Sequence, residues 1–161
     1  ASLRSSLARR RSPRAWEAAS AITPLCGLPW LVVAVLARGK HHGHMAQLTS
    51  AVEKYFEAWN AHDQAAVEKL HAPQSSLKDW DASFGPTNTE VAKGIAGIWS
   101  AVPGIKIEVV KVYTQVGKAG ESPTVVANIK VVVDDTTTLD VVDVITFDEE
   151  LRITSLDAFK V

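Results

Sequence analysis

One carboxylic acid in the chain lies among apolar residues. The segment Thr136–Phe147 is rich in Val, Thr and Ile and lies between acidic turns, which predicts a β-strand. Alternate residues of a strand share a face, so Asp143 lies between Val141 and Ile145. A buried carboxylate is costly unless it is paired, hydrogen-bonded or protonated. Asp143 is therefore either a structural residue bonded to nearby hydroxyl groups or a neutral acid that can donate a proton or a hydrogen bond.

Two further polar side chains lie on predicted apolar faces. Tyr55 belongs to the broad apolar face of a predicted helix. Asp79 lies on the same side as Leu77 in a short predicted strand, Ser75–Trp80, and Asp81 competes with it two residues later. Three polar side chains would then point into one dry space: Tyr55, Asp143, and either Asp79 or Asp81.

Such a set of groups suits enolisation, in which a proton leaves a carbon next to a carbonyl group. The reaction needs a base for that proton and donors for the oxygen on which negative charge develops. Tyr55 can donate because tyrosine is neutral at pH 7, whereas Asp143 can donate only if burial raises its pKa. Two structural alternatives stay open: Tyr55 as an amphipathic core residue, and Asp79 as the solvated end of a strand.

Composition indicates one globular domain and argues against nucleic-acid binding. The chain has 161 residues, of which 47% are hydrophobic and 22% charged. Residues 46–161 contain ten basic and seventeen acidic residues, and an acidic body does not suit nucleic acid. The single cysteine, Cys26, allows neither an internal disulfide nor a cysteine metal cluster.

Residues 1–44 differ from the rest of the chain. A basic start and a short apolar run, Leu25–Leu36, are typical of a secretory signal or an organellar presequence. Equally, Met45 opens a sequence that needs nothing before it, so the segment can be a tag or another non-native leader. We expect residues 1–44 to lie outside the fold and residues 45–161 to form the domain. The protein is then cytoplasmic if Met45 is the true start, and secreted or organellar through residues 1–37 otherwise.

The order of predicted elements is helix, helix, short strand, helix and four strands, which indicates an α+β fold. The predicted helices start near Met45, at Gln64 and at Glu90, with Asp63 capping the second and Thr89 the third. The four late strands are Ile105–Gln115, Val125–Asp134, Thr136–Phe147 and Leu151–Val161. Short polar turns between the later strands favour antiparallel pairing.

The element order and the helix segment Tyr55-Phe-Glu-Ala-Trp-Asn-Ala-His-Asp63 resemble the NTF2-like, or SnoaL-like, superfamily. The resemblance covers residues 46–161. It implies a cone: a curved antiparallel β-sheet wrapped on three N-terminal helices, also called a cystatin-like α+β fold, with a pocket at one end. It also implies a small hydrophobic ligand and a homodimer that forms through the outer face of the sheet.

Within the superfamily the chain is most similar to ketosteroid isomerase. Tyr55 and Asp143 fall where that family has its two oxyanion-hole donors, and Asp79 falls where it has its general base. The resemblance implies proton transfer on a steroid-like or cyclic enone substrate, with neither cofactor nor metal. The residues expected to line the ligand site are Phe56, Trp59, Trp99 and Leu156.

Two other functions also fit a SnoaL-like fold with these residues. A SnoaL-like polyketide cyclase also sets an acidic residue against an enolisable substrate, and a non-catalytic ligand-binding domain would keep the pocket alone. An epoxide-hydrolase-like function is disfavoured because it needs an arginine between two aspartates, and Arg152 is the only arginine after Met45. We predict that His62 and His71 are surface or capping residues without a shared metal site.

Overall fold

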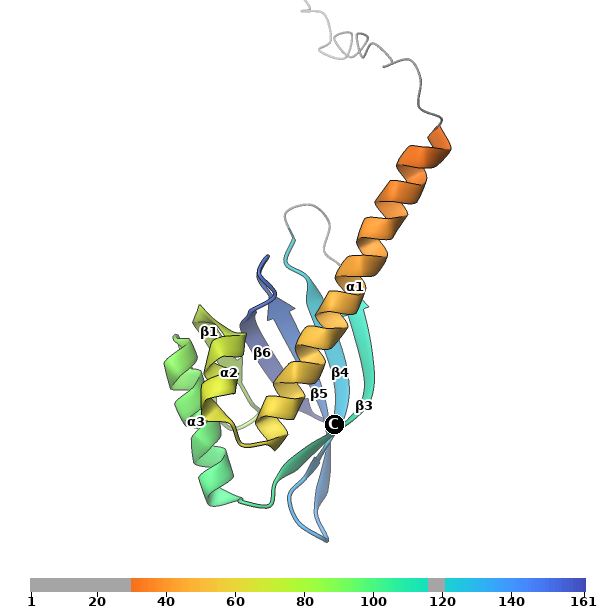
Figure 1. Ribbon diagram of the computed structural model, residues 1–161. Coiled ribbons are helices and arrows are strands. Elements are labelled where there is room, and N and C mark those ends of the chain that lie inside the picture. Colours follow the sequence, from red (N-terminus) through yellow and green to blue (C-terminus); the bar gives the residue numbers. More distant parts are fainter. Residues whose placement is uncertain (1–29, 116–120) are drawn as a thin grey trace, which may run out of the picture.

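The computed structural model describes residues 30–115 and 121–161, with side chains from residue 43 onward. It confirms an α+β arrangement of three helices and a six-stranded sheet (Figure 1). The helices are α1 (Trp30–Asn60), α2 (Gln64–Leu70) and α3 (Asn88–Ala101). The strands are β1 (His71–Lys78), β2 (Ser83–Phe84), β3 (Lys106–Gln115), β4 (Thr124–Val132), β5 (Thr138–Phe147) and β6 (Ile153–Lys160).

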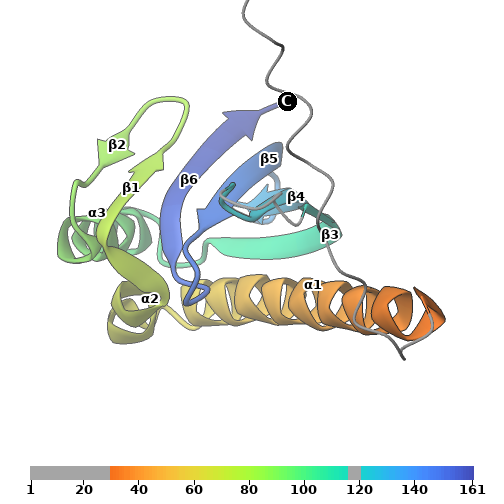
Figure 2. The same ribbon diagram turned by 90° about the horizontal axis from the view of Figure 1, so that it is seen from above.

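The sheet has the strand order β2-β1-β6-β5-β4-β3 and curves around the helices, which cover its concave face (Figure 2). Most neighbours pair antiparallel, as expected, but β1 runs parallel to β6. The chain can make this parallel pair because the later elements separate the two strands, so no tight turn has to join them. The first and last strands of the main sheet are thereby brought side by side.

The helix α1 starts earlier than the sequence pattern predicts. It passes through Met45 without a break, so residues 30–44 form its first part, and Figure 1 shows this part extending past the sheet. The stretch directly after Trp30 contains Leu and Ala, which are strong helix formers, together with Val, which a helix tolerates. The rest of the predicted leader, residues 1–29, lies outside the described residues. No helix of the described part of the chain is long and apolar enough to cross a membrane.

Helix caps agree with the sequence in one case and differ in another. Asp63 caps α2 as predicted, and its carboxylate accepts a hydrogen bond from the backbone N–H of Ala66 at 2.9 Å. The cap of α3 is Thr87, not Thr89, because Thr87 forms a complete capping box with Glu90. The start of α3 is thus displaced by only one turn or less from the predicted position.

Strand β1 begins at His71, four residues before the start of the predicted strand Ser75–Trp80. Pairing with β6 extends the strand towards its start, and the register shifts between His71 and Ser76. Pro73 lies within this irregular stretch, where its missing N–H costs no regular ladder bond. The early start of β1 carries His71 into the interior instead of leaving it on the surface.

Alternation along β5 decides which side chains enter the interior. Val141, Asp143, Ile145 and Phe147 are buried, and the residues between them are half-buried on the outer face, as the sequence predicts. On the opposite side of the interior, α3 approaches the sheet closely through Gly94, where an added Cβ would collide with the ring of Phe84. The side chain of Asp143 therefore points from the concave face of the sheet towards the helices that pack against this face.

Candidate active site

The helices and the concave face of the sheet enclose a cavity of about 340 Å³. Its lining is mainly aliphatic, and the ionisable side chains in it are Tyr55, Asp79, Asp81 and Asp143. Tyr55 and Asp143 are buried, whereas Asp81 and Trp80 are exposed, so the cavity opens beside the turn between β1 and β2. An apolar space of this size with a few convergent polar groups is the usual form of a small-molecule site.

Tyr55 projects from the last three turns of α1 into the deep end of the cavity. Its ring is 2% exposed and packs against Phe56 and His71, with ring centroids 5.3 and 5.8 Å away. Burial, followed by the charge of Asp143, raises the pKa of Tyr55 well above its ordinary value. The phenol therefore stays neutral at physiological pH and can donate a hydrogen bond.

Asp79 occupies the tight turn between β1 and β2. Its backbone N–H donates to the carbonyl of Ala82 at 2.8 Å, and its carboxylate accepts from the backbone N–H of Trp80 at 2.6 Å. Partial burial raises the pKa of Asp79, the hydrogen bond from Trp80 opposes this rise, and the charge of Asp81 adds to it. The turn thus fixes a half-buried carboxylate at the cavity and makes it more basic than an ordinary aspartate.

Asp143 lies in the middle of β5, and both of its cross-strand neighbours are small. Ala127 of β4 and Ala158 of β6 pair with it, which leaves space around its carboxyl group. No hydroxyl group of the described residues is hydrogen-bonded to this carboxyl, which disfavours the structural alternative. Burial, followed by the charge of Asp79, raises the pKa of Asp143 to about 7. Asp143 can therefore hold a proton while Asp79 is ionised.

The predicted ligand-lining residues divide into two pairs. Trp59 and Leu156 line the cavity. Phe56 and Trp99 do not, because each packs behind a lining residue: Phe56 against the ring of Tyr55 and Trp99 against that of Trp59. Successive helix residues point about 100° apart, so Phe56 turns away from the cavity when Tyr55 faces it. These two aromatic side chains support the wall and do not form it.

The histidines were predicted to be surface or capping residues, and for His71 this is wrong. His71 is 1% exposed, and neither ring nitrogen has a hydrogen-bond partner among the described residues. Burial lowers the pKa of His71 to about 4, so the imidazole behind Tyr55 is neutral. His62 is half-buried and stacks on Trp99 at 5.0 Å.

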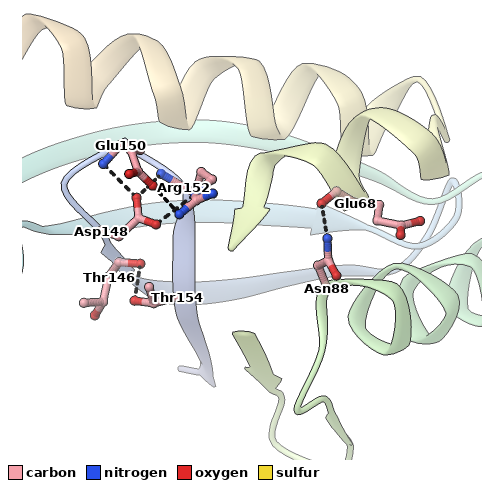
Figure 3. A network of polar contacts seen from close by, with 7 residues as sticks. All are labelled: Glu68, Asn88, Thr146, Asp148, Glu150, Arg152 and Thr154. Atoms are coloured by element: carbon pink, nitrogen blue, oxygen red, sulfur yellow. Dashed lines mark hydrogen bonds and ion pairs between the residues drawn. The ribbon is translucent and has the colours of Figure 1, made fainter. Parts of the chain in front are cut away.

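Arg152 lies outside the cavity. It forms ion pairs with Asp148 and Glu150 in the turn between β5 and β6 (Figure 3). It therefore offers no cation between Asp79 and Asp143, which removes support for epoxide-hydrolase-like chemistry. Within the described ranges, no group of three or more His, Cys, Asp or Glu side chains is arranged to hold a metal ion.

Trp80 is the aromatic lining residue that sequence patterns missed. In the predicted strand it alternates with Asp79 and would point away from the site, but the chain leaves the strand after Lys78 and turns. The turn places Trp80 at the cavity mouth with 43% of its surface exposed. The only sequence feature that could have indicated this position is that Trp80 directly follows Asp79.

The raised pKa of Asp143 predicts a pH-dependent gain in stability for Asp143→Asn. In the unfolded chain this carboxyl ionises near pH 4, whereas in the fold it keeps its proton up to about 7. The fold therefore loses stability as pH rises from about 4 to 7, and asparagine removes that loss. We expect Asp143→Asn to raise the free energy of unfolding by about 2–4 kcal/mol at pH 8 and by little at pH 4.

Urea denaturation at both pH values measures this difference. The buried His71 destabilises the fold as pH falls from about 6.5 towards 4. It does so equally in the wild type and in Asp143→Asn, so its effect cancels from the difference between the two proteins. Asp135→Asn, at an exposed turn, is the matched control and should change neither value. An equal effect of Asp143→Asn at pH 4 and pH 8 would show that its carboxyl ionises normally.

Comparison with known proteins identifies the family. The model of the SnoaL-like domain matches residues 52–156. The steroid Delta-isomerase of Nocardioides simplex is 30% identical over 119 residues, which cover 71% of this chain and 89% of that protein. A protein of unknown function with a cystatin-like fold from Methylobium petroleophilum PM1 superposes with a TM-score of 0.62 at 13% identity, covering 72% of this chain and 76% of its own.

A SnoaL-like protein of unknown function from Burkholderia thailandensis E264 superposes with a TM-score of 0.57 at 15% identity, covering 72% of this chain and 95% of its own. These two structures share the fold, and the matched sequence region spans all three residues of the candidate site, from Tyr55 to Asp143. The chain belongs to the SnoaL-like domain family.

Proposed function

We propose that this protein is a ketosteroid-isomerase-like enzyme that moves a proton within a steroid-like or other cyclic enolisable ketone. The observation that carries the proposal is one apolar cavity lined by a neutral phenol, a carboxyl group with a pKa near 7 and a second, less buried carboxylate. The similarity to a steroid Delta-isomerase supports the same reaction class. The aliphatic lining suits a hydrophobic substrate.

The proposed reaction starts from a β,γ-unsaturated ketone with its carbonyl oxygen at the deep end of the cavity. The Asp79 carboxylate removes a proton from the carbon between the carbonyl group and the double bond, and the electron pair moves onto the oxygen. Tyr55 and protonated Asp143 donate hydrogen bonds to that oxygen. Asp79 then returns the proton to the far carbon of the former double bond, which gives the conjugated ketone and restores the carboxylate.

The assay for this proposal follows the rise of enone absorbance when the protein is mixed with a β,γ-unsaturated cyclic ketone, such as 5-androstene-3,17-dione or 3-cyclohexenone. We expect turnover above the buffer rate. Absence of turnover on both ketones, by a protein that still binds a phenolic analogue of the enolate, would reject the isomerase and favour a binding domain. A SnoaL-like polyketide cyclase would instead close a ring on a linear polyketone. The cyclic product has the same mass as the substrate, so product analysis must distinguish the two by structure.

Activity should depend on pH through both aspartates. Asp79 must be ionised to accept the proton, so kcat/KM should rise with pH on the acid side. Asp143 must keep its proton to donate, so kcat/KM should fall again as pH passes about 7. Asp143→Asn retains an N–H donor that does not titrate. An alkaline fall that persists in Asp143→Asn would contradict the assigned role of Asp143.

A further inference from the structure

The turn that carries the proposed base also carries a second carboxyl group. Residues 79–82 join β1 to β2, and the turn is closed by a hydrogen bond from the backbone N–H of Asp79 to the carbonyl of Ala82, at 2.8 Å. Figure 2 shows this turn extending away from α1 and α2 beside the edge strand β2. Asp79 and Asp81 both line the cavity. Two carboxyl groups therefore lie at the cavity mouth, two residues apart on one tight turn.

The two carboxyl groups differ in their access to water. Asp79 is half-buried and accepts a hydrogen bond from the backbone N–H of Trp80 at 2.6 Å, whereas Asp81 is exposed. The charge of Asp81 helps to raise the pKa of Asp79, so the two groups are close enough to interact. Among the described residues, no cation forms an ion pair with Asp81. Its carboxylate is therefore available to accept a proton.

This arrangement gives the proposed base a route to water while a ketone occupies the cavity. After removing a proton from carbon, Asp79 is a carboxylic acid beside the carboxylate of Asp81. Interacting groups of the same type share a proton readily, so the proton can pass from Asp79 to Asp81. From the exposed Asp81 it can pass to water, and a proton from water can return by the same route. The enolate oxygen stays hydrogen-bonded to Tyr55 and Asp143 during this exchange.

We propose that Asp81 is a proton relay, through which the protein exchanges the α-hydrogen of a ketone with water as well as moving it within the ketone. In the exchange, the C–H bond at the α-carbon breaks and its proton passes through Asp79 and Asp81 to water. A proton from water then forms the new C–H bond, and both carboxylates are restored. The relay rests on the proposed function for the removal of the first proton and adds hydrogen exchange to it.

Isomerisation in D₂O tests the relay, because only exchange with the solvent brings deuterium into the product. 5-Androstene-3,17-dione is converted to a small extent, and mass spectrometry gives the deuterium content of the enone and of the recovered ketone, with buffer alone as the baseline. We expect about half of the wild-type enone to carry deuterium and Asp81→Asn to lower this fraction about fivefold. Asparagine suits a turn, so the fold should be retained.

Two further variants separate a proton relay from a general effect of charge. Asp81→Glu keeps a carboxylate that can carry a proton, so the enone should keep a deuterium fraction close to that of the wild type. Asp135→Asn removes an exposed carboxylate that does not line the cavity, and it should leave the fraction unchanged. The fraction compares exchange with transfer in the same turnovers, so it does not depend on how fast the first proton is removed.

Each other outcome has a distinct meaning. Wild-type enone without deuterium would reject the relay and keep the isomerase. A deuterium fraction that is unchanged in Asp81→Asn would show that Asp79 reaches water without Asp81, and it too would reject the relay. Deuterium in the recovered ketone that is lost in Asp81→Asn, without any enone, would keep the relay and reject the isomerisation. Protein that gives neither enone nor deuterated ketone would reject the proposed function and the relay together.

Discussion

Replacing Asp79 by asparagine should cause the largest loss of isomerase activity of any single substitution, about 10²–10⁴-fold in kcat. An amide of nearly the same shape fills the same place in the turn but cannot accept a proton from carbon. The Asp79 carboxylate is half-buried and its pKa is raised by partial burial, which makes it a suitable base. Stopped-flow or steady-state measurement of enone formation gives the effect.

Asp81→Asn is the matched control for this prediction. Asp81 lies two residues further along the same turn, lines the same cavity and is exposed. Its removal takes away one contribution that raises the pKa of Asp79, so the acid limb of the pH profile should move to lower pH with kcat reduced less than tenfold. The reverse order, with Asp81→Asn inactive and Asp79→Asn active, would assign the base to Asp81.

Tyr55→Phe should lower kcat by about 10²–10³-fold, the usual cost of one donor to a developing oxyanion. The substitution removes a hydroxyl group and leaves the ring that packs against Phe56 and His71, so the fold should be retained. KM should change much less than kcat, because the donor acts mainly on the charged intermediate. Steady-state kinetics with the β,γ-unsaturated ketone separate the two parameters.

Tyr113→Phe serves as the control for the loss of a hydroxyl group. Tyr113 is 49% exposed on β3, where Lys111 lies over its ring, and it does not line the cavity. This variant should match wild type in kcat and KM. A Tyr55→Phe protein with wild-type kcat would reduce Tyr55 to a core residue, which is the structural alternative that the sequence left open.

Local periodicity was sufficient to predict which faces enter the interior. Alternation along β5 places Asp143 inward between Val141 and Ile145, and helical spacing places Tyr55 on the buried face of α1. Both patterns depend only on residues that are close together in the chain, so they can be recognised in a single sequence. The faces predicted that Tyr55, Asp143 and one of the two acids after Leu77 share one space. The resemblance to ketosteroid isomerase selected Asp79, and all three residues line the same cavity.

Features set by distant parts of the chain were not predictable in this way. The parallel pairing of β1 with β6 joins the start and the end of the domain, and it extends β1 back to His71. Periodicity also cannot show whether a buried space is filled or empty. The orientations of Phe56 and Trp99, which pack behind the cavity wall, and of Trp80, which reaches its mouth, depend on that space.

The proposed mechanism requires Asp143 to hold a proton at a pH where Asp79 is ionised. An NMR titration of protein labelled with ¹³C at the aspartate carboxyl carbons tests this directly, with Asp143→Asn and Asp79→Asn to assign the signals. We expect one carboxyl to titrate near pH 7, to be missing from Asp143→Asn and to move to lower pH in Asp79→Asn. A titration in which every aspartate carboxyl of the wild-type protein ionises near pH 4 would contradict the account.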